Sequence, residues 1–104
     1  MKRVAFRMKL YKGQEAEYKK RHDSIWPELA ALLKQNGISS YSIFLDEYTG
    51  DLFGYLHCED ERKLDEQRHH AIMKKWWDYM KDIMETNPDN SPVTVSLKEV
   101  FYLN

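Results

Sequence analysis

The chain has 104 residues, a length that predicts a single domain, residues 1–104, around one hydrophobic core. Lys and Arg number 16 against 17 Asp and Glu, so the net charge of -1 offers no basic surface for nucleic acid. No apolar run is long enough to cross a membrane, residues 1–6 lack the hydrophobic stretch and cleavage site of a signal peptide, and Cys58 is the single cysteine. We therefore expect a cytoplasmic protein without disulfides or a cysteine-based zinc site.

The first third of the chain changes from strand periodicity to helix periodicity. From Val4 to Leu10 apolar and polar residues alternate, which is typical of a half-buried strand. From Gln14 to Asn36 apolar residues recur every three or four positions, which predicts a helix. Pro27 lies inside this run and cannot donate a helical hydrogen bond, so we expect a break near residues 24–26.

The remaining two thirds predict three strands and a second helical region. Alternation returns from Ser39 to Asp46, and a turn at 48–51 leads to a second strand from Leu52 to Cys58. A charged segment at 59–62 then opens a helical region with an apolar stripe. Val93 to Leu103 is rich in residues that favour strands, and we expect it to form the last one.

This order is strand, helix, strand, strand, helix, strand, which is the ferredoxin-like βαββαβ pattern of the α+β class. It predicts an antiparallel sheet with two helices on one face. The other face would lie bare, and packing two such sheets together would cover it. The sequence therefore predicts a homodimer of the dimeric α/β-barrel type.

Tyr18 and His22 are the first candidate functional residues. They are four positions apart on the predicted helix, so their side chains project from the same face. Histidine is the side chain best suited to acid–base chemistry near neutral pH. The alternative is a histidine that simply packs beneath the broken helix.

Aromatic residues elsewhere form a second group of candidates. Adjacent helical residues point about 100° apart, so only one of Trp76 and Trp77 can lie in the core stripe, and Trp76 fits it. Trp77 then faces solvent, a partner or a ligand. Indole rings stack on the apolar faces of sugars, and their N–H groups donate hydrogen bonds to hydroxyls. Tyr41 points to the same face of its predicted strand as Ile43 and Leu45. Ordinary core or interface packing is the alternative for all three.

The segment Asn87–Pro92 consists of turn-forming residues and predicts a structural loop, with a lining role for Asp89 or Asn90 left open. His57 is expected to point outward, and His69 and His70 to be solvated. No pair of histidines has the spacing of metal ligands, and no glycine-rich phosphate loop is present. We therefore expect neither a metal nor another cofactor.

Four segments together resemble the L-rhamnose mutarotase family, in the same order and over nearly the whole chain. They are Tyr18-Lys19-Lys20-Arg21-His22 with Ile25-Trp26-Pro27-Glu28, then Tyr41-Ser42-Ile43-Phe44-Leu45, then Trp76-Trp77-Asp78-Tyr79-Met80, and finally Asn87-Pro88-Asp89-Asn90-Ser91-Pro92 with Glu99-Val100-Phe101-Tyr102-Leu103.

The resemblance implies a dimeric ferredoxin-like fold and an isomerase, an L-rhamnose 1-epimerase of rhamnose breakdown, that needs no metal. It also implies that His22 is the catalytic acid and that Tyr18, Tyr41, Trp76 and Trp77 contact the sugar. Phe44 stands where some relatives are expected to carry tyrosine. The function so implied is exchange of the α and β anomers of L-rhamnopyranose by ring opening and closure.

Three other functions remain open from the residues themselves. A small monooxygenase on the same fold would need a large apolar pocket. A sugar-binding module would bind without accelerating anomer exchange. A structural interaction domain would place its aromatic residues at an interface.

Overall fold

The computed structural model describes residues 1–104 and contains one antiparallel sheet of four strands. The strands are β1 (Lys2–Lys9), β2 (Ile38–Leu45), β3 (Asp51–Cys58) and β4 (Val95–Leu97), in the spatial order β2-β3-β1-β4. The two central strands, β1 and β3, pair along their whole length. The split βαβ topology predicted from the sequence is confirmed.

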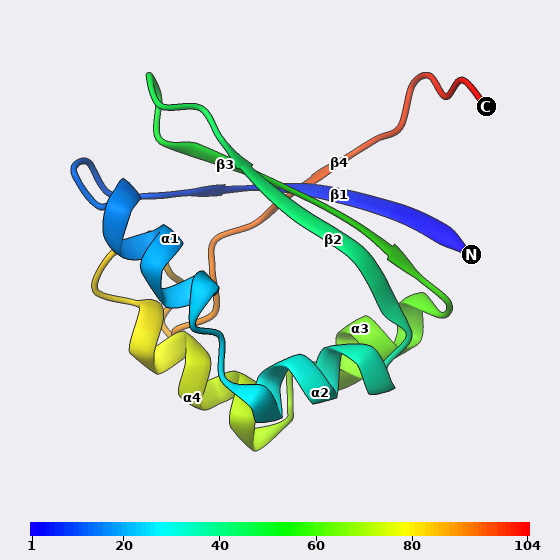
Figure 1. Cartoon of the computed structure of the whole chain (residues 1–104), viewed down its shortest axis with the longest axis horizontal. Coiled ribbons are helices and arrows are strands. Elements are labelled where there is room, and N and C mark those ends of the chain that lie inside the picture. Colours follow the sequence, from blue (N-terminus) through cyan, green and yellow to red (C-terminus); the bar gives the residue numbers. More distant parts are fainter.

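Four helices cover one face of the sheet and leave the other face bare (Figure 1). They are α1 (Glu15–Asp23), α2 (Pro27–Gln35), α3 (Glu61–Gln67) and α4 (Ala71–Met80). None of them is both long enough and apolar enough to span a membrane. The sheet and the helices thus form two layers that enclose the core between them.

The predicted number of two helices is wrong, because each helical region is split in two. The first break was expected: α1 ends at Asp23, and Pro27 opens α2 at a position where its missing N–H costs nothing. The second break, between α3 and α4, was not expected. There the Nδ1 atom of His70 accepts a hydrogen bond from the N–H of Ile72 at 3.2 Å and caps the start of α4. His70 is therefore exposed but structurally engaged.

The last strand is also shorter than predicted. Only Val95–Leu97 pairs with β1, opposite Ala5–Arg7. The chain then leaves the sheet, so residues 98–104 find no neighbouring strand in this chain and extend away from it (Figure 1). Strand propensity alone did not predict where pairing stops, because pairing also requires a partner strand.

Gly54 creates room in the inner layer for the ring of Phe6, which lies opposite it in the β1–β3 ladder. A methyl group on Gly54 would overlap the far end of that ring. Phe6 in turn packs edge-on against Tyr41, with ring centroids 6.3 Å apart. The absent side chain at Gly54 therefore fixes where an aromatic ring of the inner layer lies.

We expect Gly54→Ala to lower the free energy of unfolding by about 1–3 kcal/mol, the usual cost of overpacking a filled site. Urea denaturation followed by circular dichroism measures this. Ser42→Ala on the bare face is the control, with an expected change of no more than about 0.5 kcal/mol. Equal stability of Gly54→Ala and the wild type would contradict the packing argument.

Candidate functional site

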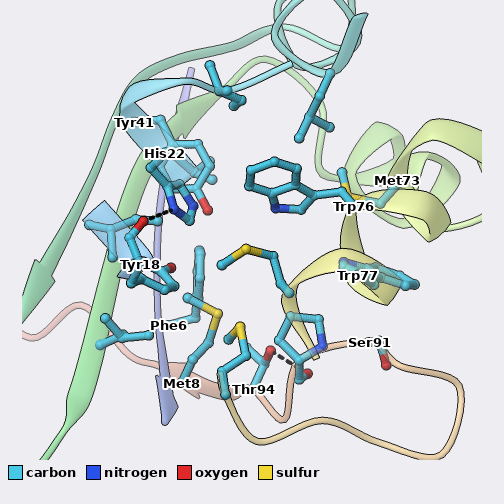
Figure 2. A pocket seen from close by; sticks show the side chains of 18 of the residues that line it. Phe6, Met8, Tyr18, His22, Tyr41, Met73, Trp76, Trp77, Ser91 and Thr94 are labelled. Carbon is cyan, nitrogen blue, oxygen red and sulfur yellow. Dashed lines mark hydrogen bonds between the residues drawn. The ribbon is translucent and has the colours of Figure 1, made fainter. Parts of the chain in front are cut away.

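A cavity of about 1060 Å³ lies between the inner face of the sheet and the helices. Its walls come from β1, β2, α1, α4 and the segment that leads to β4 (Figure 2). Most of the lining side chains are hydrophobic, with a small number of polar groups among them. Concave apolar sites with few polar groups are typical of small-molecule binding.

Tyr18 and His22 face this cavity side by side on α1, as their spacing predicted. Their rings stack with centroids 4.3 Å apart. The Nδ1 atom of His22 lies 3.0 Å from the backbone carbonyl oxygen of Tyr18. A carbonyl only accepts, so Nδ1 carries the proton and donates it. The neutral imidazole therefore keeps its lone pair on Nε2.

Burial controls the protonation of the three polar aromatic groups in the cavity. It lowers the pKa of His22, against smaller opposing effects of the Tyr18 carbonyl and the Asp23 carboxylate, so the neutral form is favoured at pH 7. Burial raises the pKa of Tyr18 well above its usual value and that of Tyr41 to about 12. Tyr41 is 39% exposed as a whole residue, and its side chain borders the cavity. Both phenols therefore remain hydrogen-bond donors.

A bulge in β2 directs Tyr41 into the cavity. Ser39 pairs with His57 and Ser42 with Tyr55, so Ser40 and Tyr41 together stand opposite one residue of β3. Ser40 has a φ of 50°, in the left-handed region that non-glycine residues seldom adopt. One extra residue reverses which side chains face inward. Without it, Tyr41 would lie on the bare face of the sheet.

Trp76 lies in the core and points into the cavity, whereas the ring of Trp77 points away from this group (Figure 2). The Trp76 ring is edge-on to His22 at 5.4 Å between centroids and edge-on to Trp26 at 5.0 Å. Trp77 is half-buried and borders the cavity from the other side of α4. The prediction that Trp76 lies in the core stripe and that Trp77 points in another direction is confirmed.

The loop before β4 contributes to the cavity through residues other than those considered from the sequence. Asn87 and Ser91 line it, whereas Asp89 and Asn90 do not. The Asp89 carboxylate instead accepts hydrogen bonds from the backbone N–H and the hydroxyl of Ser91. It holds the loop closed, and Asn87 donates from its amide to the Ser91 hydroxyl at 3.1 Å. The lining role left open for Asp89 or Asn90 is therefore wrong, and the structural role is confirmed.

A wall of apolar side chains, most of them methionines, borders the cavity, and the sequence did not predict this role for them. It comprises Phe6, Met8, Met73, Met80 and Met84. Methionine adapts its shape to irregular surfaces. Four of these positions have the spacing of core residues, since Phe6 and Met8 alternate in β1 and Met73 and Met80 lie two turns apart in α4. Only the fold shows that they border a cavity, because ordinary core packing would give the same periodicity.

The fold and the site together define a ferredoxin-like α+β protein with a small-molecule cavity equipped for proton transfer. One imidazole nitrogen, two protonated phenols and an indole converge on a mostly apolar space. This combination suits a ligand with several hydroxyl groups and an apolar face.

Comparison with known proteins shows the family to which this chain belongs. Residues 3–103 match the family model described as L-rhamnose mutarotase. An L-rhamnose mutarotase of Lachnoclostridium phytofermentans is 56% identical over the full length of both chains. One of Flavobacterium johnsoniae is 59% identical, with 98% of this chain and 95% of that protein covered. The chain belongs to the L-rhamnose mutarotase family, whose members are carbohydrate-acting isomerases.

Solved structures agree with the fold. The crystal structure of an L-rhamnose mutarotase from Formosa agariphila superimposes with a TM-score of 0.93 at 53% identity and covers both chains completely. A Mycobacterium tuberculosis protein has a TM-score of 0.61 at 15% identity, with 98% and 97% coverage, and so supports the fold alone.

Proposed function

We propose that this protein catalyses exchange of the α and β anomers of L-rhamnopyranose, a 1-epimerase reaction of rhamnose catabolism. The observation that supports it most directly is the His22 side chain, whose Nδ1 is held by the Tyr18 carbonyl at 3.0 Å beside the cavity. The names of the relatives supply the sugar. The reaction itself is a proton transfer that requires no redox change.

In this mechanism Nε2 of His22 takes the proton of the anomeric hydroxyl while the bond between C1 and the ring oxygen breaks. The imidazolium then gives the same proton to the ring oxygen, which leaves an open-chain aldehyde. Both oxygens are bonded to C1, so one nitrogen serves both. Rotation about the C1–C2 bond presents the other carbonyl face, and reversal of the two proton transfers closes the ring. His22 thus acts first as base and then as acid.

Four aromatic side chains bind the sugar in this proposal. Tyr18 and Tyr41 donate hydrogen bonds to its hydroxyl groups, since their raised pKa values keep both phenols protonated. Trp76 packs against the apolar face of the ring, and Trp77 contributes to the margin of the cavity. The apolar wall formed by Phe6 and the four methionines suits the methyl group of a 6-deoxy sugar. A sugar with a hydroxymethyl group lacks this methyl group.

The proposal is tested by NMR saturation transfer between the α and β anomeric signals of L-rhamnose. We expect catalytic amounts of the protein to accelerate exchange well beyond the spontaneous rate. Quenching or enhancement of tryptophan fluorescence by rhamnose without faster exchange would instead support a binding module. If folded protein neither accelerated exchange nor changed its fluorescence, both the mutarotase and the binding-module hypotheses would be refuted.

The rate is expected to fall in acid. Because burial lowers the pKa of His22 below 6.5, the imidazole is neutral at pH 7 and gains its proton only below that ordinary value. The base is lost as pH falls through this lowered pKa. Measurement of kcat/KM between pH 4.5 and 8, corrected for spontaneous exchange, should give a plateau at neutral pH and a decline below about pH 6.5. A decline with its midpoint above pH 6.5 would contradict a lowered pKa of His22.

We also propose that the protein is a homodimer whose subunits pack through the bare faces of their sheets. Phe44, Phe53, Val95 and Leu97 project from that face and are 37–65% exposed. Beyond it, Val100 to Leu103 extend from the chain with exposures of 54–88%. The base of this tail is fixed, since Arg3 pairs with Glu99 at 2.7 and 2.8 Å. An exposed apolar tail that continues from a bare sheet face suits a second copy of the same chain.

Analytical ultracentrifugation tests this arrangement. We expect a dimer for the wild type at micromolar concentration and a shift toward monomer for Phe101→Ser with Leu103→Ser. Lys98→Ser in the same tail is the matched control and should remain dimeric. A monomeric wild type would contradict the proposal.

A further inference from the structure

Arg21 makes more polar contacts than any other side chain beside the cavity, although it does not line it. Its Nε donates to the Glu17 carboxylate at 2.7 Å, and its terminal nitrogens donate to both oxygens of Asp82 at 2.9 and 3.2 Å. One of them also donates to the backbone carbonyl of Tyr79 at 2.8 Å. Only 10% of the Arg21 side chain is exposed. Bidentate arginine–carboxylate pairs of this kind fix geometry as well as charge.

These contacts join the two helices that carry the proposed chemistry. Arg21 lies on α1 next to His22, while Tyr79 and Asp82 lie at and just beyond the end of α4, which carries Trp76. The guanidinium also lies over the ring of Tyr79, 4.4 Å from its centroid. That ring contacts Trp76 at 5.6 Å between centroids, and Trp76 is 5.4 Å from the His22 ring. A continuous set of contacts therefore runs from Arg21 back to His22.

Helix α1 depends on such anchors. It has nine residues, no side-chain cap at its N-terminus, and Tyr18 as its sole buried residue. Helices this short are marginal without tertiary packing. With Tyr18 as the single anchor, the helix could rotate about that point, and His22 one turn further on would move. Arg21, three residues after Tyr18 and on a neighbouring face of α1, supplies a second anchor.

Arg21 also satisfies the end of α4. The last carbonyl groups of a helix lack intrahelical partners. The Tyr79 carbonyl is one of them, and Arg21 donates to it. A cation at a helix C-terminus is favourable for the helix dipole as well. The same guanidinium thus joins the last turn of α1 directly to the C-terminal end of α4.

We propose that Arg21 is a positioning residue, which clamps α1 to the end of α4 and so holds His22 at its working distance from the sugar bound beside Trp76. This inference rests on the proposed function of His22. Misplacement of a reacting group by about 1 Å can cost about 10²-fold in rate. The loss falls on kcat, because the sugar-binding side chains themselves remain.

The test compares Arg21→Met, which keeps the apolar stem, with Arg21→Lys and the control Arg62→Met. Arg62 pairs with Asp60 in the same charged manner, but its side chain is 87% exposed and lies away from the cavity. At a temperature where every variant is folded, we expect Arg21→Met to lower kcat about 10–10²-fold with little change in KM. Arg21→Lys should recover part of the loss, and Arg62→Met should match the wild type.

NMR signals of the His22 imidazole nitrogens give a readout independent of activity. Arg21→Met should shift them, whereas a residue that contributes only to stability would leave the native-state signals unchanged. If Arg21→Met does not fold, Asp82→Ala, at a residue whose side chain is 63% exposed, carries the same prediction. Unchanged kcat and unchanged His22 signals would overturn the clamp. Absence of catalysis in the wild type would refute the proposed function instead, and the His22 signals would still report on the clamp.

Discussion

Replacement of His22 with alanine is expected to lower the catalysed rate of anomer exchange by about 10²–10⁴-fold, the usual contribution of a general acid–base group. The fold should survive, because His22 is only half-buried and the buried anchor of α1 is Tyr18. Saturation-transfer NMR measures the rate, and circular dichroism measures the fold. The remaining phenols cannot replace the base, since their raised pKa values keep them protonated.

Two companion measurements separate proton transfer from packing. Free imidazole added to His22→Ala should restore part of the rate, because the removed ring leaves room beside the cavity. His69→Ala, at an exposed histidine between α3 and α4, should retain the wild-type rate. Wild-type activity in a folded His22→Ala protein would assign the reaction to another group.

The sequence predicted the parts of the site that depend on local periodicity. Tyr18 and His22 are stacked because four residues make about one helical turn, and the break at Pro27 follows from its missing N–H. Alternation along β1 likewise predicted which side chains face inward. Each of these conclusions needs only neighbours within one element.

The rest depended on contacts between elements. The bulge at Ser40 is not marked by glycine or asparagine, the residues that favour positive φ, although it determines where Tyr41 points. The break before α4 contains neither glycine nor proline, and a histidine caps it. The sequence does not distinguish Arg21 from the other charged residues, because its partner Asp82 is 61 positions away. Such partners are distant in the sequence, and a single sequence gives no measure of their proximity.

The two adjacent tryptophans differ in how they relate to the core and to the cavity. Sequence periodicity placed Trp76 in the core and Trp77 outside it, and the family resemblance made both of them candidates for the sugar. In the fold, Trp76 is 7% exposed in the core and still forms a wall of the cavity. Under the proposed mechanism one side chain therefore serves both stability and sugar binding, and a substitution at Trp76 should affect both.

We expect Trp76→Ala to lower the free energy of unfolding by about 3–5 kcal/mol, the typical cost of removing a buried tryptophan. The ring belongs to the same buried cluster as Tyr18, Met73 and Met80, and truncation to alanine removes its buried surface and leaves a cavity in that cluster. Trp77→Ala should cost about 1 kcal/mol, because Trp77 is half-buried. Urea denaturation of both variants, followed by circular dichroism, gives the comparison.

Trp76→Phe separates the two tasks of this residue. Phenylalanine keeps an aromatic ring in the core, so most of the stability should remain, but it is smaller and lacks the indole N–H. We therefore expect a higher KM for L-rhamnose with a modest loss of stability. If Trp76→Ala proved no less stable than Trp77→Ala, the burial argument would fail; if Trp76→Phe kept the wild-type KM, the sugar would have to be bound elsewhere in the cavity.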